Sequence, residues 1–179
     1  MTDEVRMPNP ETLLHQLPRG TGVIFRHYGD PNRDRVAMRL KTLCLQFGLR
    51  LLIGGDWRLA AQVNACGLHL PRHMAAASIE PGARLWLRRQ DRLLTVAAHS
   101  ARDVRRANAI GATATLLSPI FHTDSHPEQR PLGPLQCAAI TRASKIAVIA
   151  LGGVSEKTIN AIYPAGCVGV AGISFAAKK

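Results

Sequence analysis

The sequence predicts an α/β fold in which buried strands of a parallel sheet alternate with helices. Apolar runs of strand length recur along the chain, and helical segments separate them. The composition agrees, because 46% of the residues are hydrophobic but only 4% are aromatic, which suits helices on buried parallel strands better than a β-sandwich. We therefore expect one domain over residues 1–179.

The first half of the chain contains two clear βα units. GVIFR at 22–26 is a β-branched and aromatic run, which predicts a strand. Residues 32–47 carry apolar side chains at three- and four-residue spacing, which predicts an amphipathic helix entered through Asn32 or Asp34 and ended at Gly48. The alternation continues with predicted strands at 50–53, 67–70 and 93–97 and predicted helices at 57–66 and 83–90.

The second half repeats this pattern, with predicted strands at 113–117, 146–150 and 167–171 and helices at 101–111, 134–144 and 155–166. Each of the seven predicted strands ends in polar residues or glycines. The carboxyl ends of strands in βα folds carry the functional loops. We therefore expect the stretch 113–133, where an apolar run breaks into proline, hydroxyls and histidines, to form such a loop.

The formal charge of +11 favours anionic partners. Nucleic acid is disfavoured as the main partner, because the arginines are scattered and no nucleic-acid motif occurs. The four cysteines form no C-x-x-C pair and are predicted to be reduced core thiols. Because the chain shows neither a signal peptide nor an apolar run near ~20 residues, we expect a cytoplasmic protein without a membrane segment.

Glycine turns follow two successive strands, in ALGGV (150–154) and GVAGIS (169–174). Such a turn, followed by a helix opened at Ser155, lets backbone N–H groups approach an anion, and βα barrels commonly bind phosphate between their last two βα loops. Each motif alone is explained as well by a tight turn that needs glycine. Because two consecutive units carry it, we favour phosphate binding.

Four polar residues near strand ends each allow two interpretations. Asp56 follows two glycines, where its carboxylate could hold Mg²⁺ beside substrate phosphates or cap the helix that starts at Trp57. His69, His99 and His126 could transfer protons or could serve as structural hydrogen-bonding residues.

Five motifs occur in order along the chain: GLHLPRH (67–73), AAHS (97–100), GATATLLSPIFHTDSH (111–126), ALGGV and CVGVAGIS (167–174). In order and spacing they resemble the thiamine phosphate synthase and TenI family, over roughly residues 20–175. The resemblance implies a TIM (β/α)8-type barrel. It also implies condensation of hydroxymethylpyrimidine diphosphate with thiazole phosphate, with release of a pyrophosphate held by Mg²⁺.

The resemblance also implies roles for individual residues. Arg26, Ser100 and His126 would be catalytic, and Asp56 would bind the metal. Substrate contacts would come from His69, Thr123, Ser125, Gly152, Gly153, Ala171 and Gly172, and the last four of these would hold the thiazole phosphate.

The chain departs from the family at four contacts to diphosphate or metal. Ile24 stands in place of a glutamine, Tyr28 and His126 in place of lysines, and Met74 in place of a second aspartate. The loss of a charged contact to a leaving group can cost several kcal/mol of transition-state stabilisation. A non-catalytic or divergent, TenI-like protein that binds thiazole phosphate or thiamine phosphate is therefore the alternative to a synthase.

The amino terminus departs from the family too. MTDE at 1–4 resembles the end of the family's first strand, with the apolar residues of that strand absent. We therefore expect a barrel that lacks its first strand, through a late start of the chain, and that exposes strand edges to be covered by a partner such as a second copy in a homodimer.

Overall fold

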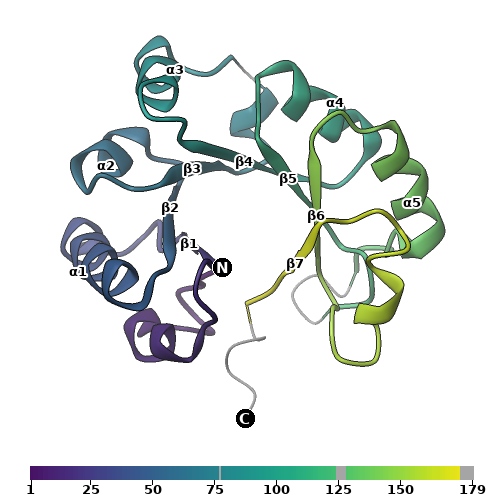
Figure 1. Cartoon of the computed structure of the whole chain (residues 1–179), viewed down its shortest axis with the longest axis horizontal. Coiled ribbons are helices and arrows are strands. Elements are labelled where there is room, and N and C mark those ends of the chain that lie inside the picture. The colour runs from purple at the N-terminus through teal and green to yellow at the C-terminus, as the bar shows by residue number, and fades with distance from the viewer. Residues whose placement is uncertain (77, 124–127, 174–179) are drawn as a thin grey trace. The chain divides into compact units, whose positions relative to one another are not determined.

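The computed structural model describes residues 1–76, 78–123 and 128–173. Parallel strands follow one another in the sheet in chain order (Figure 1). The described residues contain seven strands: β1 (Gly22–Phe25), β2 (Arg50–Gly54), β3 (Gly67–Leu70), β4 (Leu93–Ala98), β5 (Ala114–Leu117), β6 (Ala147–Leu151) and β7 (Gly169–Ala171). They also contain five α-helices: α1 (Arg33–Phe47), α2 (Trp57–Gln62), α3 (Pro81–Arg88), α4 (Ala101–Ala109) and α5 (Gly133–Ala143).

By its internal contacts the chain divides into two compact units. The first contains Met1–His69 and Ile79–Leu93, and the second contains Leu70–Ser78 and Leu94–Gly172.

The core of the first unit forms between α1 and strands β1 and β2. The register pairs Phe25 with Ile53, and both side chains are fully buried together with Leu40 and Cys44 of α1. The helix ends at Gly48, which has a φ of 68° and caps it in the left-handed conformation. The predicted helix and its glycine end are therefore confirmed.

The core of the second unit forms between β5, β6 and helices α4 and α5. Leu117, Val148 and Ala150 are buried against Ile140 of α5. Cys137 of α5 contributes a fully buried thiol. The four cysteines are free thiols, and Cys44, Cys137 and Cys167 are buried as expected, whereas Cys66 is only partly buried and is not a core thiol.

Most predicted elements are confirmed, but the helix predicted over 155–166 is wrong. Of that segment only η3 (Ile159–Ala161), one turn of 3₁₀-helix, is helical. The Thr158 hydroxyl accepts a hydrogen bond from the Ser155 N–H over 2.8 Å and donates one to the Gly153 carbonyl over 3.2 Å. These side-chain bonds compete with the helical pattern, so no helix N-terminus follows the Gly152–Gly153 turn.

The short 3₁₀-helix η1 (Pro10–Gln16) was not expected from the sequence, and among the described residues no strand precedes β1. Instead, the Thr2 N–H donates to the Ile24 carbonyl over 2.8 Å, and the Thr2 hydroxyl accepts from the Arg26 N–H over 2.9 Å. The chain's own first residues therefore cover part of the β1 edge that we expected to need a partner.

Candidate functional site

Three predicted site residues of the first unit lie at the carboxyl ends of β1, β2 and β3. Arg26 follows β1, Asp56 follows β2, and His69 is in β3, paired in register with Gly54. The Gly55 N–H donates to the His69 carbonyl over 2.8 Å. Parallel pairing thus brings these residues to the same end of the strands, as the sequence pattern predicts.

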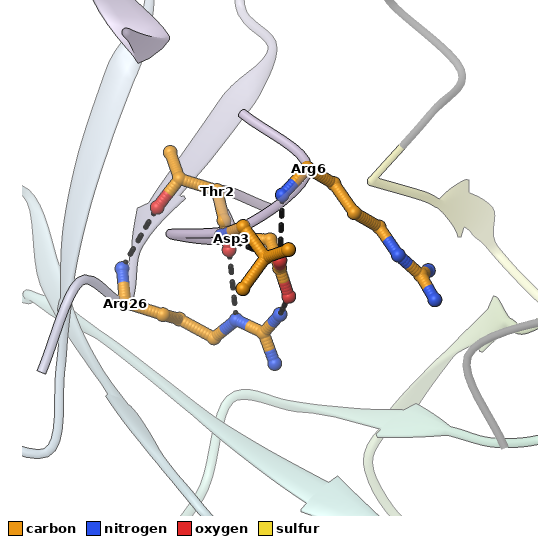
Figure 2. A network of polar contacts seen from close by, with 5 residues as sticks. Thr2, Asp3, Arg6 and Arg26 are labelled. Atoms are coloured by element: carbon orange, nitrogen blue, oxygen red, sulfur yellow. Dashed lines mark hydrogen bonds and ion pairs between the residues drawn. The ribbon is translucent and has the colours of Figure 1, made fainter. Parts of the chain in front are cut away.

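Arg26 is engaged by the amino-terminal segment (Figure 2). Its Nε donates to the Thr2 carbonyl over 3.0 Å, and its Nη2 lies 3.3 Å from Oδ2 of Asp3. The other Asp3 oxygen accepts the Arg6 N–H over 3.1 Å, which fixes the carboxylate. The charge of Arg26 is therefore already balanced by a carboxylate in this structure.

His69 is a buried, neutral side chain. It is 2% exposed, and burial, with smaller contributions from the positive charges of Arg26 and the chain's amino group, lowers its pKa to about 3. At neutral pH the His69 side chain therefore carries no positive charge.

The Asp56 carboxylate has two partners. Oδ1 accepts the N–H of Leu59 over 3.0 Å, which makes Asp56 the N-cap of α2. Oδ2 lies 3.4 Å from Nη1 of Arg33, the first residue of α1. The capping role that the sequence suggested is confirmed, and Arg33 is a partner that the sequence did not reveal.

In the second unit, the ends of β4 and β5 hold a hydrogen-bonded cluster around Asp103. The Ser100 hydroxyl accepts the Asp103 N–H and caps α4. Burial opposes ionisation of Asp103, but hydrogen bonds from the His99 N–H and the Ser100 hydroxyl, together with the nearby charge of Arg72, lower the pKa of Asp103 overall. The ring Nδ1 of His99 lies 2.7 Å from the Ser118 carbonyl. Because a carbonyl oxygen can only accept, Nδ1 is the donor in this hydrogen bond.

The ends of β6 and β7 bring the predicted phosphate-binding residues together. Leu151 pairs in register with Ala171, so Gly152 and Gly153 follow one strand where Gly172 follows its neighbour. Gly152 and Gly153 have φ angles of 88° and 65°. Successive backbone N–H groups in a turn can form a concavity that binds anions.

In the turn at Gly152 the backbone carbonyls accept hydrogen bonds from the protein, whereas the backbone N–H groups donate to no described residue. The Gly152 carbonyl accepts the Phe121 N–H over 3.0 Å, and the Gly153 carbonyl accepts the Thr158 hydroxyl over 3.2 Å. Within the part of the chain that the structure describes, the N–H groups of Gly152, Gly153 and Val154 donate to no protein group. Three consecutive donors are therefore available to a ligand.

Glycine is also required here for packing. A Cβ on Gly152 would lie 2.9 Å from the Pro119 Cα, and one on Gly153 would lie 2.7 Å from the Phe121 Cβ. The loop after β5 thus packs directly on the turn, which supports the backbone explanation of these glycines. Thr123 is half-buried on this loop. Ser125 and His126 lie outside the described residues.

The described side chains offer few ligands to Mg²⁺. Among residues 1–76, 78–123 and 128–173, no three His, Cys, Asp or Glu side chains are grouped as metal ligands. At Asp56, both carboxylate oxygens already have partners. Met74, which the resemblance places where the family has a second aspartate, offers a thioether, a poor ligand for a hard cation. The residues described do not fit a magnesium site.

Comparison with known proteins identifies the family. A family model described as thiamine monophosphate synthase matches residues 4–176. The chain belongs to the thiamine monophosphate synthase family. Its place in thiamine biosynthesis follows from this membership, and the family predicted from the five motifs is confirmed.

Individual relatives show how far the similarity extends. The chain is 32% identical over 167 residues to a provisionally named thiamine-phosphate synthase 2 of Aquifex aeolicus, covering 92% of this chain and 87% of that protein. It is 29% identical over 179 residues to a thiamine-phosphate synthase of Geobacillus thermodenitrificans, covering 93% and 77%. It is also 32% identical to one of Synechococcus, covering 97% of this chain but 50% of that protein.

A solved structure supports the fold. Thiamine phosphate pyrophosphorylase from Pyrococcus furiosus superposes with a TM-score of 0.77 at 22% identity, covering 97% of this chain and 83% of that one. The fold is therefore α/β of the TIM-barrel type, as predicted. Among the described residues, no helix is both long and apolar enough to cross a membrane.

Proposed function

We propose that this member of the thiamine monophosphate synthase family binds thiazole phosphate at the Gly152–Val154 turn and condenses it with hydroxymethylpyrimidine diphosphate. In this reaction the lone pair of the thiazole nitrogen forms a C–N bond to the pyrimidine methylene carbon. The C–O bond to the diphosphate breaks, and pyrophosphate leaves with the electron pair. The three available N–H groups at residues 152–154 carry the proposal, because such donors suit a phosphate.

The other predicted site residues enter as proposals of the same function. His69 and Thr123 would contact substrate as neutral hydrogen-bonding groups, and Ala171 and Gly172 would complete the phosphate site. Ser125 and His126 are proposed on the resemblance alone. A catalytic Ser100 would have to act while it caps α4, so we assign it to positioning the end of β4. A cytoplasmic location and a homodimer remain predictions from the sequence.

Calorimetry with thiazole phosphate tests the binding step. We expect saturable binding that competes with inorganic phosphate. The absence of binding at the highest soluble ligand concentration would contradict the proposal.

Turnover is tested separately, by measuring thiamine phosphate from both substrates. A protein that binds thiazole phosphate but forms no product would support the non-catalytic alternative, which the engagement of Arg26 by Thr2 and Asp3 favours.

A further inference from the structure

The carboxylate of Asp56 already holds a cation, and that cation is a side chain of the same unit. The guanidinium of Arg33 contacts two oxygens at the end of β2, the Gly54 carbonyl and one Asp56 carboxylate oxygen. Its Nη2 donates to the Gly54 carbonyl over 2.6 Å, and its Nη1 lies 3.4 Å from Oδ2 of Asp56. A divalent cation could bind these oxygens only by displacing the guanidinium.

The structure holds Arg33 firmly in this place. Its guanidinium carbon lies 5.8 Å from the ring centre of Phe25 and 5.4 Å from that of Tyr28. The Arg33 side chain is only 14% exposed, and aromatic faces attract a cation more strongly when water is excluded. The helix α1 starts at this residue. The position of the charge is therefore set by secondary structure and packing together.

Tyr28 contributes to this arrangement from the position where the family carries a lysine. Burial raises the pKa of Tyr28, which Arg26 and Arg33 offset only in part, so its phenol stays neutral. A Cβ on Gly54 would lie 2.9 Å from the Tyr28 hydroxyl oxygen. The glycine thus makes room for the tyrosine, and the tyrosine ring supports the arginine.

We propose that Arg33 takes the place of the divalent cation in this chain, so that its guanidinium, held at the end of β2 by Asp56, meets the diphosphate group of the substrate without Mg²⁺. The identity of the substrate rests on the function proposed above. A guanidinium suits this task because it is always charged and presents several N–H donors in one plane, which pair with phosphate oxygens two at a time. Nη1 and Nη2 each carry a second N–H besides the one used in the protein.

The inference is tested by titrating the full chain with inorganic pyrophosphate in a calorimeter, once with excess EDTA and once with excess Mg²⁺. We expect binding in EDTA. Arg33→Gln should weaken that binding by about tenfold or more, as expected for the loss of a hydrogen bond to a charged group. Arg39→Gln is the matched control, because Arg39 lies on the same helix, carries the same charge and is 68% exposed. It should change the affinity by less than about twofold.

A second variant keeps the test decisive if Arg33→Gln does not fold. Asp56→Asn retains a side chain that caps helices well but removes the carboxylate that a metal would need. We expect Asp56→Asn to bind pyrophosphate in EDTA at least as tightly as the wild type, because Arg33 loses its competing anion. Pyrophosphate binding that requires Mg²⁺ and is lost in Asp56→Asn would overturn the inference, and so would equal affinities of the Arg33 and Arg39 variants.

Mn²⁺ provides a readout that does not depend on pyrophosphate. Binding of Mn²⁺ to a protein reduces the electron paramagnetic resonance signal of free Mn²⁺. We expect the same small reduction with the wild type and with Asp56→Asn. A tight Mn²⁺ site that disappears in Asp56→Asn would refute the proposal that Arg33 takes the place of the divalent cation. The thiazole phosphate titration is independent of both measurements, so failure of the proposed function and failure of this inference can be told apart.

Discussion

The Ser100 hydroxyl donates a hydrogen bond to the Asp103 carboxylate over 2.9 Å and accepts one from the Asp103 backbone N–H over 3.2 Å. Each residue is therefore both donor and acceptor for the other. This reciprocal pair begins α4 and joins it to the end of β4, since the same carboxylate accepts the His99 N–H over 3.1 Å. A serine that the family resemblance places in the active site thus has a structural task.

Ser100→Ala should lower the free energy of unfolding by about 1 kcal/mol, the usual cost of losing an N-cap side chain. Urea denaturation measures it. Ser155→Ala is the control, because the Ser155 hydroxyl is exposed and lies 3.3 Å from that of Thr158. A variant with wild-type stability but strongly reduced turnover would show that Ser100 acts on the substrate rather than on the helix.

Gly153→Ala should destabilise the protein by roughly 2 kcal/mol or more, because the residue has a positive φ and an added methyl group meets a packed loop. The methyl group would contact the His122 carbonyl and the Phe121 side chain. Thermal unfolding measures the change. Gly169→Ala is the control, since a Cβ there meets nothing within 4 Å. Equal melting temperatures of the two variants would contradict the packing described for this turn.

The stability of the protein should fall as pH drops from 6.5 towards 3. The folded pKa of His69 is lowered to about 3 from an ordinary value of 6.5, so within this window the unfolded chain binds a proton that the folded chain does not. The stabilising contribution of neutral His69 is fully present above pH 6.5. Below that pH, the free energy of unfolding falls by at most about 1.4 kcal/mol per pH unit. Urea unfolding of wild type and His69→Gln across this range measures it. Parallel pH profiles would rule out His69 as the cause.

Cys66 should react first with a thiol reagent under native conditions. It is half-buried, whereas Cys44, Cys137 and Cys167 are buried. Burial, with a smaller effect of the neighbouring Cys66, raises the pKa of Cys44 to about 11, which keeps its reactive thiolate rare at neutral pH. Dithionitrobenzoate kinetics should show one fast thiol, and Cys66→Ser should remove the fast phase. Two fast thiols in the wild type would contradict the burial described here.

The local pattern of the sequence predicted most of the fold. Short apolar runs that alternate with helical segments favoured strands buried on both faces, and the three- and four-residue spacing of α1 predicted a helix with one apolar face. The segment 155–166 was mispredicted because helical spacing says nothing about a hydroxyl that competes for backbone groups. Thr158 forms those side-chain bonds instead of a helix.

By itself the sequence determined the alternation of strands and helices, the glycine turns after β6 and β7, and the family to which the chain belongs. These features depend on residue type and on spacing over a few positions. The tertiary structure decided which charged side chains lie next to each other. Arg33 is 23 residues from Asp56 along the chain, and no local pattern links them. Parallel pairing of β1 with β2 brings the start of α1 to the end of β2, and only then does Asp56 acquire a guanidinium as its cation.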